Sequence, residues 1–278
     1  MFKTCLLCSA ALIVSVAAGT VGAGAQDSAI PNFTSTQSGW LLAGGIDFRP
    51  VEGKQKPVSF DPAYPQVGQG NQRGVMERMS DAENPNLTPW AQNIMRKFNR
   101  EVLDGHRAFS SQSRCWPGGV PGQLLFPFEP MYFIQLPKVI YIMWQRDQHV
   151  RRILLTDKHS EDVEPTWFGE SIGHYENGDT LVVDTIGLQT KNSYLDNFRT
   201  PHTEKLHVVE RFTVSQDRNT LTAIVTVDDP DAYNAPLTMQ QRWSKVNEPM
   251  GESICAENNF DFFSQNLFPV PMHEKPDF

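Results

Sequence analysis

The feature of the sequence that most restricts its fold is a run of short β-rich segments between residues 131 and 246. The predicted strands are 131–135, 138–146, 150–156, 166–175, 179–186, 205–214, 220–228 and 237–246. Polar tips of hairpin length, such as Asp147-Gln148-His149 and Gln216-Asp217-Arg218-Asn219, connect some of them. Strands linked in this way form an antiparallel meander, and about eight of them can close into a barrel without free edges. We therefore expect a mainly β protein built on one antiparallel barrel.

The residues before this run predict an N-terminal extension, 26–113, that carries a single helix. Gly, Pro, Gln, Asn and Ser are frequent up to about residue 86 and interrupt any long element. Thr88 is a typical helix cap and Pro89 suits a first helical turn, which predicts a helix over 89–103. Its packed stripe is expected to contain Trp90, Ile94, Phe98 and Val102. We expect residues 114–259 to form a calycin- or lipocalin-like barrel domain and residues 260–278 a C-terminal tail.

The first 25 residues have the pattern of a secretory signal peptide. Lys3 precedes an apolar run over 10–18, and the small residues Ala23-Gly24-Ala25 follow it. The run is too short to span a bilayer, which requires about 20 residues. The formal net charge of −8, with acids and bases interspersed, argues against nucleic acid or an anionic membrane as partner. The sequence therefore predicts an exported protein, periplasmic or secreted, that acts on a small molecule.

Two cysteines remain after the signal peptide, Cys115 and Cys255. An even number of cysteines in an exported chain favours a disulfide. Their wide separation lacks the close paired spacing of a zinc site, although a metal site or a reactive thiol is a weaker alternative. We expect the bond to tie the turn before the barrel to the segment after its last strand.

The predicted strand 205–214 carries most of the candidate site residues. Side chains alternate along a strand, so His207 and Arg211 share one face while Glu210 lies in the apolar row of the other. A carboxylate in an apolar row must find a partner or shift its pKa. Glu210 is therefore either a buried ion pair or a catalytic acid, and the sequence leaves both open.

The face that points into the barrel decides which residues form the site. If it is the His207 face, we expect His207 and Arg211, about 13 Å apart at 3.3 Å per residue, to grip two ends of a ligand, with His202 and Asp184 as further members. If both point outward to solvent, Glu210 is the residue to test. We predict the first arrangement. The expected ligand-binding residues are Trp167, Ser171, His174, Tyr175 and Tyr233.

An ordered series of motifs extends through the predicted barrel. It comprises Pro165-Thr-Trp167-Phe-Gly-Glu-Ser171-Ile-Gly173, Asp179-Thr-Leu-Val-Val-Asp184-Thr, Leu206-His207-Val-Val-Glu210-Arg211 and Asp229-Pro230-Asp-Ala-Tyr233. The series resembles an uncharacterised family of exported bacterial proteins over roughly residues 114–259. The resemblance implies a shared fold and a shared pocket but brings no activity with it. The family usually has Asp-Gly-Arg-x-His where this chain has Asp157-Lys158-His159, so a shared substrate does not follow.

Three functions are compatible with these residues. The first is a lyase, dehydratase, isomerase or hydrolase that uses histidines and carboxylates for acid–base chemistry on a hydroxylated or aromatic compound, with no organic cofactor. The second is a calycin-like carrier that holds an apolar ligand among barrel aromatics such as Trp144 and Trp243. The third is a metal site built from histidines, for which the sequence has no recognised ligand spacing; the candidates are His159, His174, His202 and His207. Ser171 in a Gly-x-Ser-x-Gly pattern lacks the strand-turn-helix context of a nucleophile.

Overall fold

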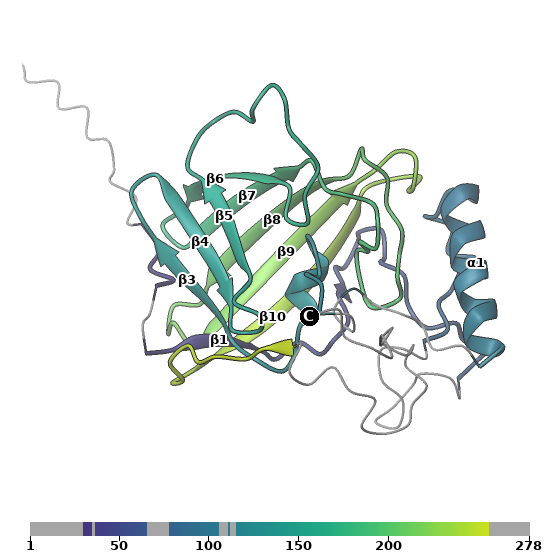
Figure 1. The fold of residues 1–278 in the computed structure, drawn as a ribbon, viewed down its shortest axis with the longest axis horizontal. Coiled ribbons are helices and arrows are strands. Elements are labelled where there is room, and N and C mark those ends of the chain that lie inside the picture. The colour runs from purple at the N-terminus through teal and green to yellow at the C-terminus, as the bar shows by residue number, and fades with distance from the viewer. Residues whose placement is uncertain (1–29, 35–36, 66–77, 106–110, 112–114, 256–278) are drawn as a thin grey trace, which may run out of the picture.

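A computed structural model describes residues 30–34, 37–65, 78–105, 111 and 115–255 of the chain (Figure 1). The protein is mainly β, with one sheet of 10 strands and the helix α1 (Pro89–Leu103). The strands are β1 (Gly39–Leu42), β2 (Arg49–Pro50), β3 (Met131–Gln135), β4 (Val139–Trp144), β5 (Val150–Leu154), β6 (Glu170–Glu176), β7 (Thr180–Ile186), β8 (His207–Val214), β9 (Thr220–Asp228) and β10 (Leu237–Val246). The predicted signal peptide and C-terminal tail lie outside the described residues.

The hydrogen bonds between strands run around a closed ring. From β3 to β10 the strands pair in sequence order, and β1 pairs with both β10 and β3. Gly39 lies opposite Val246, and Trp40 lies opposite both Lys245 and Met131. The short strand β2 pairs with the other half of β10. The N-terminal segment is therefore part of the sheet, which the sequence analysis missed because β1 is only four residues long and has no alternating pattern.

One pairing corrects the prediction of a purely antiparallel sheet. Strands β5 and β6 run parallel, with Ile153 opposite Ser171 and Leu154 opposite Ile172. The link over 155–169 is too long for a hairpin, and its length lets β6 return in the same direction as β5. The two predicted hairpin tips are confirmed, since β4–β5 and β8–β9 pair antiparallel on either side of them.

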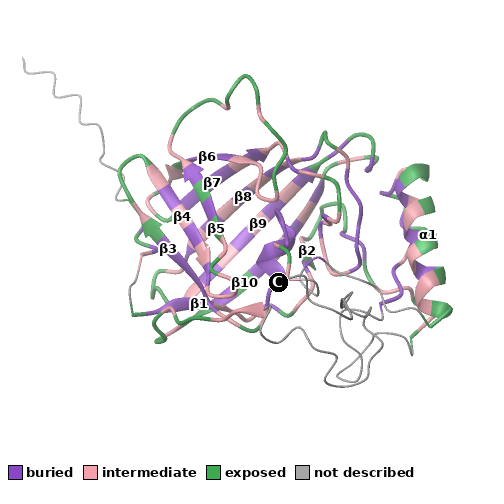
Figure 2. Ribbon diagram, viewed as in Figure 1, coloured by how far each residue is buried: buried purple, intermediate pink, exposed green. Residues whose placement is uncertain are grey.

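The interior of the ring is filled by one row of side chains from each strand. Buried and half-exposed residues alternate along β8 and β9, as Figure 2 shows. Aromatic rings meet across the interior, with centroids 5.9 Å apart for Phe133 and Phe212 and 6.4 Å apart for Phe212 and Trp243. Trp144 is also buried. These aromatic residues pack the core instead of lining an open chamber.

Helix α1 has the predicted bounds and cap. The Thr88 hydroxyl accepts a hydrogen bond from the Ala91 amide at 3.4 Å, and Pro89 occupies the first turn. The predicted stripe is correct only in part: Phe98 packs against the core, but Trp90 is 43 % exposed and the buried positions are Ala91, Met95 and Asn99. Asn99 tolerates burial because its amide is paired with Ser80, which hydrophobicity alone does not reveal.

Loop side chains hold α1 at one end of the ring (Figure 1). The Arg199 guanidinium lies 3.9 Å from the centroid of the Phe98 ring and donates to Glu101 at 3.2 Å. The amide of Thr88 donates to the carbonyl of Ala232 in the β9–β10 link at 3.0 Å. The helix thus covers an end of the structure, outside the ring, as predicted.

The disulfide between Cys115 and Cys255 is confirmed. It joins residues 140 positions apart, with their Cα atoms at 5.4 Å. It therefore ties the segment before β3 to the segment after β10 and encloses nearly the whole sheet. Within the described ranges, no helix has both the length and the apolar character that a membrane crossing requires.

We expect the Cys115→Ser/Cys255→Ser variant to lose about 2 to 5 kcal/mol of unfolding free energy, because the unfolded chain is no longer constrained by the long loop. Urea unfolding of the variant and of the oxidised wild type measures this difference. Reductant should lower the wild-type midpoint and leave that of the variant unchanged. Two titratable thiols in the denatured, unreduced mature protein would show that the bond does not form.

Candidate functional site

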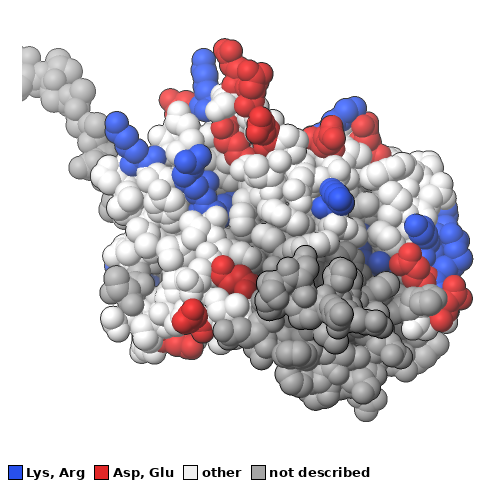
Figure 3. Space-filling view, in the orientation of Figure 1, with Lys and Arg blue, Asp and Glu red and all other residues white. Residues whose placement is uncertain are grey.

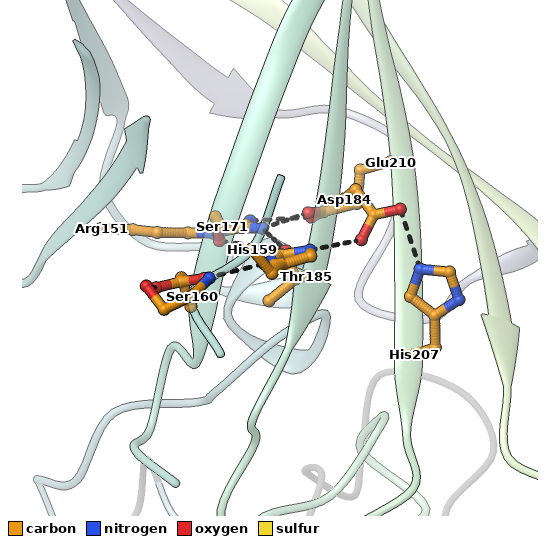
Figure 4. Close-up of polar contacts among 9 residues, drawn as sticks. Arg151, His159, Ser160, Ser171, Asp184, Thr185, His207 and Glu210 are labelled. Atoms are coloured by element: carbon orange, nitrogen blue, oxygen red, sulfur yellow. Dashed lines mark hydrogen bonds and ion pairs between the residues drawn. The ribbon is translucent and has the colours of Figure 1, made fainter. Parts of the chain in front are cut away.

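Glu210 lies inside the ring, on the face of β8 that points to the core. Its carboxylate is fully buried and accepts two hydrogen bonds from Arg151 on β5, at 3.0 and 2.5 Å. The same guanidinium donates to Ser171 on β6 at 3.1 Å and to Thr185 on β7 at 2.8 Å. Arg151 is itself 1 % exposed. Figure 4 shows this group, in which the charge of Glu210 is matched within the core.

This arrangement fits the ion-pair interpretation of Glu210. Its carboxylate forms a bidentate pair with the Arg151 guanidinium within the core. Ser171 is held in the same network within strand β6, so it has no nucleophile elbow either. Glu210 and Ser171 are thus residues that hold strands together.

His207 and Arg211 share a face, as predicted, but that face is the outer one. Their side chains are each 42 % exposed, while Val208, Glu210 and Phe212 between and beside them are buried. The expectation that the two residues line the interior is therefore wrong. The physical reason is that the apolar row of β8 outweighs one carboxylate, which the core accommodates through Arg151.

The outer face of β6, β7 and β8 carries a connected chain of four ionisable side chains. His207 Nε2 lies 2.9 Å from Asp184 Oδ2, and His159 Nε2 lies 2.8 Å from Asp184 Oδ1. His159 Nδ1 lies 3.0 Å from Glu170 Oε1. The order is Glu170, His159, Asp184, His207, and we refer to these four residues as the relay. Figure 4 labels three of them, His159, Asp184 and His207. Alternation along the strands explains why Glu170, Asp184 and His207 point outward, since each directly flanks an inward-facing residue.

Electrostatics in the relay favour its charged forms. The hydrogen bond to Asp184 raises the pKa of His207 above its ordinary value, against a smaller opposing effect of burial. Burial acts to raise the pKa of Asp184, but the hydrogen bonds from His207 and His159 outweigh it and hold that pKa low. Hydrogen bonds from Ser160, and then from His159, lower the pKa of Glu170. The relay is therefore arranged to keep two carboxylates ionised and His207 readily protonated.

His159 comes from the β5–β6 link and fixes that link to the sheet. Each of its two ring nitrogens lies within hydrogen-bond distance of a carboxylate oxygen, one of Glu170 and one of Asp184. Ser160 strengthens the attachment, because its amide and hydroxyl donate to Glu170 at 2.7 and 2.6 Å. His207 differs, since Asp184 occupies only Nε2. Its Nδ1 points away from Asp184 in Figure 4, and the side chain is open to solvent.

Arg211 belongs to a second outer cluster. It donates to Glu176, whose other oxygen lies 3.0 Å from His174 Nε2. The His174 side chain is 60 % exposed. His207 and Arg211 therefore lie in separate clusters, since one pairs with Asp184 and the other with Glu176.

The remaining predicted residues do not join the relay. His202 is buried in the 187–206 loop, where its ring nitrogens lie 3.2 Å from Ser193 Oγ and 3.0 Å from Thr203 O, and burial lowers its pKa. The buried Tyr233 donates to the Pro201 carbonyl, and Tyr175 accepts from Gln135 at 2.9 Å. Trp167 packs near Trp116 with ring centroids 6.0 Å apart. The predicted ligand-binding set is therefore dispersed.

A cavity of about 340 Å³ lies at the β5–β6 seam, next to the relay. The relay residue Glu170 is part of its wall. The complete lining is Val150, Arg152, Leu154, Asp162, Val163, Glu164, Thr166, Phe168, Gly169, Glu170 and Ser171. Gly169 has φ 60°, and a Cβ there would lie 2.2 Å from the Ile186 carbonyl oxygen, so only glycine fits this part of the wall. The volume is within the range of small-molecule sites.

The four histidines considered for a metal do not come together. His159 and His207 both contact Asp184, whereas His174 pairs with Glu176 and His202 is enclosed by its loop. Across the described residues, no group of three or more His, Cys, Asp or Glu side chains has an arrangement that could hold a metal ion.

Sequence reasoning missed Glu170 and Arg151 and considered His159 only as a metal ligand. The alternation in β6 offered one signal, because Glu170 must lie opposite in face to Ser171. Arg151 had a similar signal, because alternation in β5 places it on the same face as the apolar Ile153. The position of His159 had none, since a loop residue reaches Asp184 only through tertiary structure. Comparison with protein-family models and with curated proteins gives no match to this chain.

We expect Arg151→Met to destabilise the fold by about 3 to 5 kcal/mol, because it leaves the Glu210 carboxylate buried and unpaired. Arg151→Met/Glu210→Leu should recover most of this loss by replacing the ion pair with apolar side chains. The control is Arg152→Met on the neighbouring exposed residue, expected within about 0.5 kcal/mol of wild type. Equal losses in Arg151→Met and Arg152→Met in chemical denaturation would contradict the buried pair.

We expect Asp184→Asn to lower the pKa of His207, because the neutral amide removes the charge that favours the imidazolium while burial still opposes it. In the wild type the imidazolium should therefore persist to higher pH than in the variant. NMR titration of the His207 ring protons measures both midpoints, and His174 serves as an internal control that should not move. An unchanged His207 midpoint would mean that the contact with Asp184 is absent in solution.

Proposed function

We propose that this protein is an exported small-molecule enzyme that uses acid–base chemistry without an organic cofactor, with His207 and Asp184 as its proton-transfer pair. The observation that carries the proposal is the relay, whose three contacts measure 2.8 to 3.0 Å. A carboxylate behind an imidazole fixes the ring and stabilises the charge that develops when the ring takes a proton. Asp184 supports His207 in this way, and the His207 side chain is 42 % exposed and so open to a substrate.

The chemistry follows from the hydrogen-bond directions. When Nε2–H of neutral His207 donates to Asp184, the lone pair of Nδ1 is available as a general base. It would remove a proton from a substrate hydroxyl or activated C–H group, and the imidazolium would then return the proton to a leaving group or a neighbouring carbon. This cycle suits a lyase, dehydratase, isomerase or hydrolase acting on a hydroxylated or aromatic compound.

The fold and location are proposed on related grounds. The closed ring of strands supports a calycin-like barrel, and the motif series supports membership of the exported bacterial family that it resembles. The disulfide is compatible with an oxidising compartment and so supports export to the periplasm or beyond. The alternative of a carrier with an apolar ligand inside the barrel is less well supported, because Phe133, Phe212 and Trp243 pack against one another in the interior.

A metal function for the histidines is also less well supported. Each of the four candidate imidazoles already has a hydrogen-bond partner, and a carboxylate is that partner for His159, His174 and His207. His174 and His202 also lie apart from the relay, so the four candidate imidazoles do not converge on one point. The relay therefore favours proton transfer over metal ligation.

Activity measurements test the proposal once a screen of hydroxylated and aromatic compounds finds a substrate. His207→Gln should lower kcat by about 10²- to 10⁴-fold, the usual effect of removing a general acid–base group. His174→Gln removes an exposed imidazole that also faces a carboxylate but lies outside the relay, and it should keep wild-type kcat. Full turnover in His207→Gln would overturn the assignment.

The pH profile gives a second readout. Because a general base must be neutral, kcat/KM should rise with pH through the pKa of His207, which Asp184 holds above its ordinary value. Asp184→Asn should move this limb to lower pH as well as reduce the rate. A limb that stays in place would mean that another group titrates.

A further inference from the structure

We propose that the cavity at the β5–β6 seam binds a small zwitterion with an apolar side chain, such as an apolar α-amino acid. The inference goes beyond the proposed function and does not rest on it, because the His207 ring is not part of the wall of this cavity. It starts from the charges in the cavity wall, which are of both signs.

Three exposed charged side chains around the cavity have no side-chain partner among the residues that the structure describes. They are Arg152 from β5 and Asp162 and Glu164 from the β5–β6 link. None of them makes a hydrogen bond or ion pair within the described part of the chain, although they line one cavity. Opposite charges that share a cavity without meeting can each bind a separate charged group of one ligand. A guanidinium suits a carboxylate, and the two acids suit an ammonium group.

The acidic side of the cavity belongs to a link that is held in place. Ser160 and His159 attach it to Glu170 and Asp184, and Thr166 exchanges hydrogen bonds with Gly187 and Gln189 at 3.0 and 2.9 Å. A Cβ on Gly187 would lie 2.3 Å from Val163 Cγ1, so the link packs closely there. Figure 3 shows acidic side chains gathered where this link rises at the top of Figure 1. Asp162 and Glu164 are therefore carried on a segment anchored on both sides.

The rest of the wall determines the kind of zwitterion. Val150, Leu154, Val163 and Phe168 are apolar. Phe168 is itself supported by the buried Trp144, with ring centroids 5.8 Å apart. An inorganic ion has no apolar surface to place against these side chains. A purely anionic ligand would be repelled, because the wall holds three carboxylates and one guanidinium. An amino acid with an aliphatic or aromatic side chain fits all three kinds of surface.

Calorimetric titration of the purified mature protein with L-phenylalanine tests the proposal. Two analogues each remove one charge: L-phenylalanine methyl ester keeps only the ammonium, and N-acetyl-L-phenylalanine keeps only the carboxylate. We expect both to bind at least 10-fold more weakly than the free amino acid. No binding of L-phenylalanine or L-leucine at millimolar concentration would overturn the proposal.

Variants assign the two ends of the ligand. In Arg152→Met, phenylalanine and its methyl ester should bind with similar Kd, because the partner of the carboxylate is gone. In Asp162→Asn/Glu164→Gln, phenylalanine and its N-acetyl derivative should bind with similar Kd, because the partners of the ammonium group are gone. Glu161→Gln, in the same link but outside the cavity lining, and Arg218→Met, in the β8–β9 turn, are matched controls that should keep the wild-type preferences. Unchanged preferences in the first two variants would place the ligand elsewhere.

The outcome separates this proposal from the proposed function. His207→Gln should bind phenylalanine with wild-type Kd, since its ring is not part of the cavity wall. Binding in all forms without any relay-dependent turnover would support the zwitterion site and contradict the enzyme. His207-dependent turnover of other compounds, without amino acid binding, would support the enzyme and contradict the zwitterion site.

Discussion

The ion pair between Arg151 and Glu210 is the interaction on which the rest of the structure depends. Strands β5 and β6 share only the two register pairs Ile153–Ser171 and Leu154–Ile172, so the ring is weakly paired at this seam. Arg151 compensates by reaching across the interior to side chains on β6, β7 and β8. Burying two charges is costly, and the bidentate geometry with two further hydroxyl contacts offsets that cost. The seam is held mainly by side chains.

The same contacts position the outer face. Ser171 and Thr185 are held from inside, and their neighbours Glu170 and Asp184 therefore point outward at fixed places on adjacent strands. His207 reaches Asp184 from β8, and His159 reaches it from the link that begins where β5 ends. The Arg151–Glu210 pair thus helps to fix the register of these strands, and this register brings the relay residues within contact of one another. The cavity lies at this seam, where β5 and β6 share only a short ladder and the β5–β6 link forms part of the wall.

The sequence could predict what depends on local patterns. β-Rich composition between turn residues identified β3, β9 and β10 with their bounds, cap chemistry identified α1, and cysteine number and spacing identified the disulfide. Alternation also separated His207 and Arg211 from Glu210. It could not decide which face is inside, because that choice depends on Arg151, which lies 59 positions away. The strand β1, the parallel β5–β6 pair and the place of His159 likewise depend on contacts that appear only in three dimensions.

The central claim is that Asp184 and His207 act as one unit in proton transfer. A double-mutant cycle on kcat/KM tests it most directly, with Asp184→Asn, His207→Gln and the combined variant assayed on the same substrate. If Asp184 acts through the imidazole, the combined variant should be no slower than His207→Gln alone. Losses that multiply in the combined variant would show that the two residues act independently and would contradict the account.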